Sequence, residues 1–245
     1  RAEKAYLSAV SSRRMETARE YADRHGLSHA FDSWEDMIAS DVVDAIYVAT
    51  PTSVREEICL AAARGGRHVL GEKPFASLDS VLRIVAACRE NDVAFMDGTH
   101  FPHHPRTSEI RARSEELVGR PLSLASAFQF GLPDRSNIRY NPELEPMGAI
   151  GDAGWYNMRA VVEYLPPDLE VEGAAAFLRR DEETGAVSAG SGVLRFAGGL
   201  TSTWNCGFDS AAFVGDARIS GTAGVLHMDN FLFDDDDGSA SFRVR

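Results

Sequence analysis

The chain has 245 residues, 44% of them hydrophobic, which is enough to bury a sizeable core and to build two modest domains. It carries 37 acidic against 25 basic residues, and its net charge of −12 repels phosphate backbones and anionic membranes, so neither nucleic acid nor a membrane is expected as a partner. The three cysteines, Cys59, Cys88 and Cys206, form no CxxC pair and are odd in number, which favours free thiols in the reducing cytoplasm over a disulfide framework or a zinc site.

The two ends of the chain add further expectations. No apolar run approaches the roughly 20 residues that span a bilayer, and residues 1–6 lack the apolar stretch of a signal peptide. The first residue is not Met, so we expect the chain to be an internal piece of something longer.

The first part of the chain alternates short apolar runs with capped helical periods, which is typical of βαβ units and a parallel sheet. Gly26 is expected to end the first helix, and capping-box patterns that begin at Ser33 and Ser53 predict the starts of the next two. Strands are expected at residues 5–12, 44–50, 68–74 and 93–96. A fourth helix is expected from about Leu78 to Glu90, with an inward face of Val81, Leu82, Val85 and Ala86.

The pattern changes after residue 107, where a helix, a strand, a polar loop with prolines and a helix over about 152–163 are expected. Beyond residue 169 nearly everything is predicted as strand, in segments 171–178, 187–196, 200–206, 216–220 and 225–229. Several of these segments alternate apolar with polar residues, which predicts an open antiparallel sheet with one wet face. The run Asp234–Asp237 is expected to be a solvated turn rather than a cation site.

No glycine-rich phosphate loop occurs in the sequence. A dinucleotide site requires a strand that opens onto a helix through GxGxxG, because only glycine lets the backbone approach the pyrophosphate. The nearest string, Gly148, Gly151 and Gly154, follows a loop rather than a strand and does not fit this role. The chain itself is therefore expected to bind a dinucleotide poorly.

The end of the first strand offers a different cofactor signal. It resembles the second strand of a dinucleotide-binding unit, whose end reads the adenosine ribose, and it holds Ser12 and Arg13 where an acid would select NAD. A hydroxyl and a guanidinium suit a 2′-phosphate, so NADP is favoured and NAD is the second choice. The structural alternative is that Ser12 is an ordinary helix N-cap and Arg13 a solvated residue of the first turn.

Three motifs follow one another along the chain: DAIYVATPTS from Asp44, HVLGEKP from His68 and GDAGWY from Gly151. In this order, with helices between them and a sheet at the end, the chain resembles the Gfo/Idh/MocA oxidoreductases, in the branch of glucose-fructose oxidoreductase, dihydrodiol dehydrogenase and xylose dehydrogenase. The resemblance implies an NAD(P)-binding domain over residues 1–98, whose Rossmann-type parallel sheet lacks its first βα unit. It implies a substrate-binding and oligomerisation α+β domain over residues 99–245, with an open antiparallel sheet and helices on one face. Family members usually continue further at both ends.

The EKP motif carries the main implied role in the first domain. Lys73 is the implied catalytic lysine, which bonds the reacting oxygen and the nicotinamide ribose, and Glu72 is an implied cofactor contact. A lysine that leaves a buried parallel strand at its carboxyl end lies where such sheets bind ligands. The plain alternative is a surface lysine at a strand exit, since Pro74 fixes a turn irrespective of chemistry.

The turn after the preceding strand is a second implied cofactor contact. Thr50 and Pro51 match the family's cofactor-facing turn. Thr52 and Arg55 depart from the Asn and His of the TPNxxH pattern, so the contacts from these two positions stay open.

In GDAGWY, Asp152 and Tyr156 are four residues apart at the start of a helix and are expected on one face of it. With Gly154 they meet the family's D-x-G-x-Y pattern, in which the tyrosine is implied to be the acid/base or substrate-binding hydroxyl. A nearby ammonium would lower the tyrosine pKa from its usual ~10 and favour proton exchange. The alternatives are that Asp152 caps the helix and that Tyr156 packs in the core.

Three histidines, His100, His103 and His104, lie where related enzymes join their two domains and line the substrate cleft. We expect His100 and His103 to contact substrate. A metal site is the weaker hypothesis, because the nearest acids are Asp97 and Glu109 and the implied reaction uses no metal.

The preferred hypothesis is an oxidoreductase that transfers a hydride between NADP(H) and a secondary alcohol of a sugar or cyclic diol, with Lys73, Asp152 and Tyr156 converging on one cleft. The alternative is a catalytically inactive or truncated relative that acts as a non-enzymatic binding protein, and the missing glycine-rich turn is the evidence for it. Apolar side chains on the open sheet are expected to pair with a second copy, as a homodimer or a higher homo-oligomer.

Overall fold

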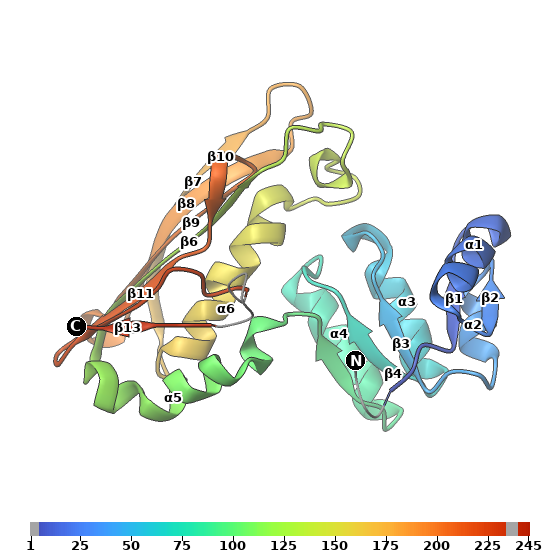
Figure 1. Ribbon diagram of the computed structural model, residues 1–245, viewed down its shortest axis with the longest axis horizontal. Coiled ribbons are helices and arrows are strands. Elements are labelled where there is room, and N and C mark those ends of the chain that lie inside the picture. The colour runs from blue at the N-terminus through green and yellow to red at the C-terminus, as the bar shows by residue number, and fades with distance from the viewer. Residues whose placement is uncertain (1–4, 234–239) are drawn as a thin grey trace. The chain divides into compact units, whose positions relative to one another are not determined.

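The computed structural model describes residues 5–233 and 240–245 of the chain (Figure 1). The chain is organised as two compact units, residues 1–98 and 99–245. The acidic run 234–237, for which a solvated turn is expected, lies outside the described residues.

The first unit alternates strands with helices, as the βαβ pattern predicts. Its strands are β1 (Ala9–Ser11), β2 (His29–Phe31), β3 (Ala45–Val48), β4 (His68–Gly71) and β5 (Phe95–Asp97). Its helices are α1 (Met15–His25), α2 (Trp34–Ala39), α3 (Thr52–Arg64) and α4 (Leu78–Glu90). The strand pairs described in this unit are all parallel.

These parallel strands form two pieces rather than one sheet (Figure 1). β1 pairs with β2, and β3, β4 and β5 pair in that order. In the Rossmann strand order 3-2-1-4-5-6, the first strand separates the two that correspond here to β1 and β3. The break falls at that position, which confirms a Rossmann-type sheet without its first βα unit.

Most helix ends in this unit follow local sequence signals. Gly26 ends α1 in the left-handed conformation, with a φ of 68°. Ser33 Oγ accepts a hydrogen bond from the Asp36 amide at 3.1 Å and so caps α2. At the start of α4, Ser77 Oγ accepts one from the Ser80 amide, also at 3.1 Å.

The capping box predicted to start at Ser53 is wrong. The N-cap position of α3 is Pro51, two residues before Ser53, and no side chain caps the helix. The Glu56 carboxylate, which would close the box, instead pairs with Arg83 of α4 at 2.5 Å.

The buried face of α4 also differs from the prediction. Leu82 is 55% exposed and Ala86 is exposed, whereas Ile84, Ala87 and Cys88 are buried. Apolar residues lie on most sides of this helix, so its period alone does not identify the face that packs against α3.

The second unit contains a large sheet and its helices. Its strands are β6 (Pro121–Gly131), β7 (Val171–Arg180), β8 (Val187–Phe196), β9 (Thr201–Gly207), β10 (Asp209–Val214), β11 (Ala217–Gly221), β12 (Val225–Met228) and β13 (Arg243–Val244). Its helices are α5 (Pro105–Val118) and α6 (Trp155–Tyr164). Its short helical turns are η1 (Phe101–His103), η2 (Ile138–Tyr140), the π-helical η3 (Ile150–Gly154) and η4 (Ala197–Gly199). The sequence pattern does not predict β10 and β13, nor does it predict β2 of the first unit.

The sheet of the second unit has the order β13-β12-β11-β6-β9-β8-β7, and β10 also pairs with β6. The strand pairs are antiparallel except for β6 with β9, which is parallel. The predicted open antiparallel sheet is therefore confirmed, with one parallel pair within it. α5 and α6 cover one face of it, as predicted (Figure 1). The core beneath these helices includes Ile110, Leu124, Ala160, Ile219 and Leu226.

Two glycines let the segment before α6 pass close to the sheet. Gly148 has a φ of +47°, and a Cβ built on it would lie 2.3 Å from the Val187 carbonyl oxygen of β8. At the end of η3, a Cβ on Gly154 would lie 3.3 Å from Cys206 Sγ. These glycines therefore serve close packing against the sheet.

Replacing Gly148 with alanine is expected to destabilise the protein by about 2–4 kcal/mol, because alanine adds backbone strain at positive φ and a clash with a carbonyl oxygen. Gly185→Ala is the matched control, since Gly185 has a φ of +73° but no atom within 4 Å of its Cβ position. It is expected to cost about 1–2 kcal/mol. Denaturant unfolding of the two variants measures the difference, and equal losses would contradict a role for the contact with β8.

Candidate active site

The carboxyl ends of β3, β4 and β5 lie at one edge of the first unit, because the three strands are parallel and in register. The turns that leave this edge contain Thr50 and Pro51 after β3, Glu72 and Lys73 after β4, and Gly98 after β5. The Glu72 and Gly98 amides continue the ladders with backbone hydrogen bonds of 3.0 and 2.8 Å. Four residues predicted to contact the cofactor therefore share one edge.

Glu72 is held in place by its neighbours. The Tyr47 hydroxyl donates to Glu72 Oε1 at 2.5 Å, and the Lys73 amide donates to Oε2 at 3.2 Å. A Cβ on Gly98 would lie 3.0 Å from the Glu72 carboxyl group, so the adjacent turn has little spare room. Burial and the bond to Glu72 raise the pKa of Tyr47 to about 12, which keeps its phenol protonated as a donor. The carboxylate thus fixes the backbone from which the half-buried Lys73 extends.

Arg55 joins the turns after β3 and β4. It is 4% exposed and donates hydrogen bonds to the carbonyl oxygens of Thr50 and Pro74. It also donates to Thr52 Oγ1 at 3.2 Å. Thr52 and Arg55, whose contacts the sequence leaves open, are thus bonded to one another. An arginine within the otherwise apolar inner face of α3 is the signal by which sequence reasoning could find it.

The Thr50 hydroxyl is buried and has no hydrogen-bond partner among the described residues. A buried polar group without a protein partner is commonly satisfied by an ordered water or a bound molecule. Its place in the turn after β3 agrees with a ligand at the carboxyl edge.

Ser12 and Arg13 lie between β1 and α1. The N-cap position of α1 is Arg14 and no side chain caps the helix, so the alternative in which Ser12 is the cap is wrong. The Ser12 amide instead extends the β1–β2 ladder by bonding the Phe31 carbonyl oxygen at 3.0 Å, which leaves Ser12 short of the helix. The exposed side chains of Arg13 and Arg14 make no hydrogen bond or ion pair with the described part of the chain. An uncapped helix N-terminus, a hydroxyl and two guanidinium groups together fit a phosphate.

In the second unit, Asp152 lies in η3 and Tyr156 in the first turn of α6. The N-cap positions of these elements belong to Ala149 and Gly154, and neither element has a side-chain cap. The alternative in which Asp152 caps the helix is therefore wrong. Its carboxylate instead accepts a hydrogen bond from Arg139 Nε at 2.7 Å.

The Tyr156 ring is buried in an aromatic cluster. Its centroid lies 5.4 Å from that of His100, 6.2 Å from that of Phe101 and 5.3 Å from that of Phe128. His100, which is exposed, also stacks on Phe233 at 5.2 Å. Tyr156 therefore packs in the core of this unit, and its ring contacts one of the two histidines predicted to bind substrate.

The other two histidines have separate surroundings. His104 Nδ1 accepts a hydrogen bond from the Arg106 amide at 3.0 Å and caps α5. The His103 side chain is exposed in η1 and joins none of the contacts around Tyr156, so its role toward substrate stays a prediction. Across residues 5–233 and 240–245, no three His, Cys, Asp or Glu side chains are grouped to hold a metal ion.

Arg139 is a candidate site residue that the sequence reasoning misses. Burial lowers the pKa of Arg139, but the hydrogen bond to Asp152 and the negative charges of Asp152 and Glu145 raise it overall, so the guanidinium stays charged. Arg139 lies in a loop whose sequence has no hydrophobic periodicity. No local pattern therefore distinguishes this arginine from the others.

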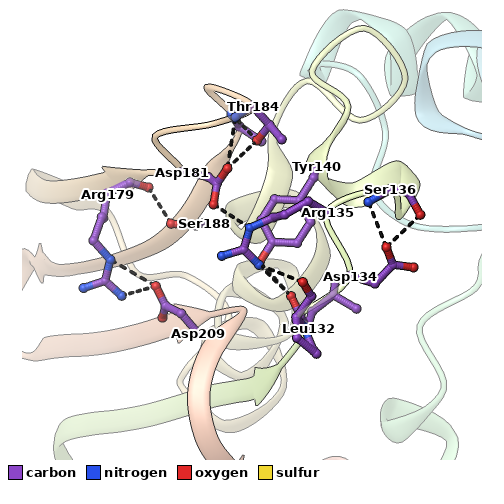
Figure 2. Close-up of polar contacts among 12 residues, drawn as sticks. Leu132, Asp134, Arg135, Ser136, Tyr140, Arg179, Asp181, Thr184, Ser188 and Asp209 are labelled. Carbon is purple, nitrogen blue, oxygen red and sulfur yellow. Dashed lines mark hydrogen bonds and ion pairs between the residues drawn. The ribbon is translucent and has the colours of Figure 1, made fainter.

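The loop that contains η2 is fixed to the β7–β8 hairpin (Figure 2). Arg135 Nε pairs with Asp181 Oδ2 at 2.7 Å, and Arg135 Nη1 donates to the Tyr140 hydroxyl at 2.9 Å. The guanidinium also lies over the Tyr140 ring, 4.4 Å from its centroid. Asp181 in turn accepts hydrogen bonds of 3.0 Å from the amide and hydroxyl of Thr184. This network of contacts holds η2 in place. Because Arg139 belongs to η2, the network also holds the guanidinium that binds Asp152.

Each unit contains one part of the predicted reaction centre. Lys73 belongs to the first unit, and Asp152 and Tyr156 belong to the second, so their convergence on one cleft stays a prediction. Within the second unit, Arg139 bonds Asp152 and His100 packs against Tyr156, and the two pairs are linked along the chain because Asp152 and Tyr156 are four residues apart.

Two family models match the chain. The model described as "Oxidoreductase family, NAD-binding Rossmann fold" of the Gfo/Idh/MocA group matches residues 1–99, and the "GFO/IDH/MocA C-terminal domain" matches residues 111–227.

Individual relatives agree with these models. A dTDP-3,4-didehydro-2,6-dideoxy-alpha-D-glucose 3-reductase from Actinomadura kijaniata is 30% identical over 91% of this chain and 66% of the relative. D-xylose 1-dehydrogenase (NADP(+)) 2 from Haloferax volcanii is 31% identical over 83% of this chain and 62% of the relative. A 3-ketoreductase structure from A. kijaniata, in complex with NADP and TDP-benzene, superimposes with a TM-score of 0.91 at 27% identity, over 100% of this chain and 74% of that one. The chain thus spans about two thirds of the length of the curated relatives it matches.

Proposed function

Because the chain belongs to the Gfo/Idh/MocA oxidoreductase family, we propose that it takes part in hydride transfer between NADP(H) and a secondary alcohol of a sugar or cyclic diol. The observation that carries this proposal is the carboxyl edge of β3–β5, where Thr50, Glu72 and Lys73 lie together on a parallel sheet. The relatives named as NADP-dependent or NADP-bound sugar oxidoreductases support it. They disfavour the alternative of a non-enzymatic binding protein.

The side chains divide the chemistry between them. The bound nicotinamide supplies or accepts the hydride. Lys73 donates a hydrogen bond to the reacting oxygen, and Tyr156 exchanges a proton with that oxygen. Asp152, whose carboxylate Arg139 orients, binds a neighbouring substrate hydroxyl, and His100 beside Tyr156 lines the substrate site, together with His103.

Substitution at Lys73 and Tyr156 tests this assignment. Lys73→Arg and Tyr156→Phe are each expected to lower kcat by about a hundredfold or more, because general acid–base groups typically contribute factors of 10²–10⁴. Tyr164→Phe is the matched control, since Tyr164 is buried on the same helix and its hydroxyl contacts Thr107 at 3.3 Å. NADPH absorbance with a panel of sugars and cyclic diols, on the chain and on any longer product of its gene, gives the rates. A Tyr156→Phe enzyme with the activity of the Tyr164→Phe control would remove Tyr156 from the reaction.

The cofactor phosphate is proposed to bind at the start of α1. Ser12, Arg13 and the free N–H groups of the helix would hold the 2′-phosphate, which favours NADP over NAD. Thr50, Pro51 and Glu72 would face the nicotinamide end, where the turns after β3 and β4 meet.

An intact cofactor site is expected to bind NADPH roughly tenfold to a hundredfold more tightly than NADH, since a guanidinium bonded to phosphate contributes about 1.5–3 kcal/mol. Arg13→Gln should remove most of this preference, whereas Arg19→Gln, further along the exposed side of α1, should not. Fluorescence titration of the 245-residue chain should show weak binding of either cofactor, because the sequence contains no GxGxxG turn. Equal affinities in a longer form would contradict the role of Arg13, and no binding in any form would favour the non-enzymatic alternative.

The open face of the large sheet is proposed as a homo-oligomer interface. Phe177 on β7 and Val193 on β8 are exposed on this face, with Phe177 81% exposed. Both side chains line a shallow hollow of about 480 Å³, together with small residues, Trp204, Asn205 and Asp216. Burying such a surface against a second copy would remove it from water. The buried free thiols Cys59, Cys88 and Cys206 agree with the proposed cytoplasmic location. No described helix is long and apolar enough to cross a membrane.

A dimer or larger assembly is therefore expected in sedimentation velocity at micromolar concentration. Phe177→Glu should shift it toward monomer, because a charge would be buried in the apolar contact. Val162→Glu, on the exposed side of α6, is the matched control and should leave the assembly unchanged. A wild-type monomer at these concentrations would contradict the proposed interface.

A further inference from the structure

Arg55 forms a clamp between the two turns at the carboxyl edge of the first unit. Its Nη2 donates to the Thr50 carbonyl oxygen and its Nη1 to the Pro74 carbonyl oxygen. Thr52 completes the clamp: its Oγ1 accepts from Arg55 Nη1 at 3.2 Å and donates to the Pro74 carbonyl oxygen at 3.5 Å. Thr50 is in the turn after β3, and Pro74 directly follows Lys73.

A guanidinium suits this position better than other cations. Its N–H donors form a planar fork, so one side chain bonds carbonyl groups that belong to two different turns. Burying the charge is unfavourable unless hydrogen bonds compensate it, so the carbonyl contacts are integral to keeping Arg55 inside. The clamp therefore couples the positions of the two turns.

Lys73 is consequently constrained on both sides. Before it, Glu72 is held by the Tyr47 hydroxyl at 2.5 Å and accepts the Lys73 amide. After it, the Pro74 carbonyl oxygen is held by Arg55. A lysine whose two neighbours are fixed in this way extends from a defined backbone position.

A second arginine in the same unit provides a comparison. Arg67 donates to the Ile38 carbonyl oxygen at 3.0 Å and to the Ser40 carbonyl oxygen at 2.5 Å. It lies immediately before β4, at the amino end of the strand, and ties the end of α2 to the turn after α3. The two arginines thus use the same bonding pattern at opposite ends of β4.

We propose that Arg55 is a positioning residue that sets where the Lys73 ammonium lies relative to the turn containing Thr50. Its catalytic consequence rests on the proposed hydride transfer, whereas its effect on Lys73 does not. Arg67, at the amino end of the same strand, has no corresponding effect on Lys73.

The composition of the chain allows Lys73 to be observed directly. The sequence contains two lysines, Lys4 and Lys73, so reductive methylation of a Lys4→Arg background with isotopically labelled formaldehyde labels Lys73 and the amino terminus. In NMR spectra, Arg55→Gln is expected to shift the Lys73 methyl signal and to alter its pH titration. Arg55→Lys should shift the Lys73 signal less, because lysine retains a charged donor. Arg67→Gln should leave the Lys73 signal unchanged.

Kinetics of the unmethylated protein test the catalytic consequence. Arg55→Gln is expected to lower kcat about tenfold to a hundredfold with little change in the KM for the sugar or diol, since misplacing a catalytic group affects the reacting geometry. Arg55→Lys should recover part of the loss. Arg67→Gln should lower the unfolding temperature while keeping kcat, provided that the assay runs below that temperature.

The outcomes separate the two proposals. An unchanged Lys73 signal in folded Arg55→Gln overturns the clamp, and if that variant does not fold, an unchanged signal and kcat in Arg55→Lys do the same. A changed signal with an unchanged kcat overturns the catalytic consequence. A Lys73 signal that responds to Arg55 in a protein that turns over no sugar or diol supports the clamp and refutes the proposed function.

Discussion

The parallel register of β3, β4 and β5 is the constraint on which the site of the first unit depends. Because the carboxyl ends of the three strands share one edge, turns at residues 50–51, 72–74 and 98 become neighbours although they are far apart in sequence. The space between them is then small, and two polar groups occupy it: the half-buried carboxyl group of Glu72 against Gly98, and the buried guanidinium of Arg55. Pairing of the three strands brings the turns together, and the two polar groups then fix the conformation of the turns.

In the second unit, the sheet positions the site through a turn that packs unusually close to it. Gly148 and Gly154 permit this approach, and the π-helical turn between them presents Asp152 to Arg139. Desolvation largely offsets the attraction within a partly buried ion pair, so such a pair is weak evidence for stability. We interpret the Arg139–Asp152 pair as orienting the carboxylate. The separate network around Arg135 keeps that orientation by holding the loop itself (Figure 2).

Local patterns in the sequence were sufficient to predict most of the elements and the places of the candidate residues. α4 begins and ends where its helical period predicts, at Leu78 and Glu90, and Lys73 is found in the turn after β4 because that position depends on the strand alone. The roles of Arg55 and Arg139 depend on partners 19 and 13 residues away, which no local pattern records. The buried face of α4 and the strands β10 and β13 escaped prediction for the same reason, since packing and sheet pairing decide them.

Lys73 is one of very few lysines in a chain whose basic residues are almost all arginines. Among the 25 basic residues are 23 arginines and two lysines, Lys4 and Lys73. In the ion pairs and carbonyl contacts described above the cation is a guanidinium, which is always charged and bonds several acceptors at once. An ammonium is compact and can change its protonation state in a desolvated site, which a guanidinium cannot do. At the carboxyl edge of β4 the two cations therefore have different tasks. Arg55 bonds the Thr50 and Pro74 carbonyl oxygens and holds the backbone, whereas Lys73 is the cation that we propose for the reacting oxygen.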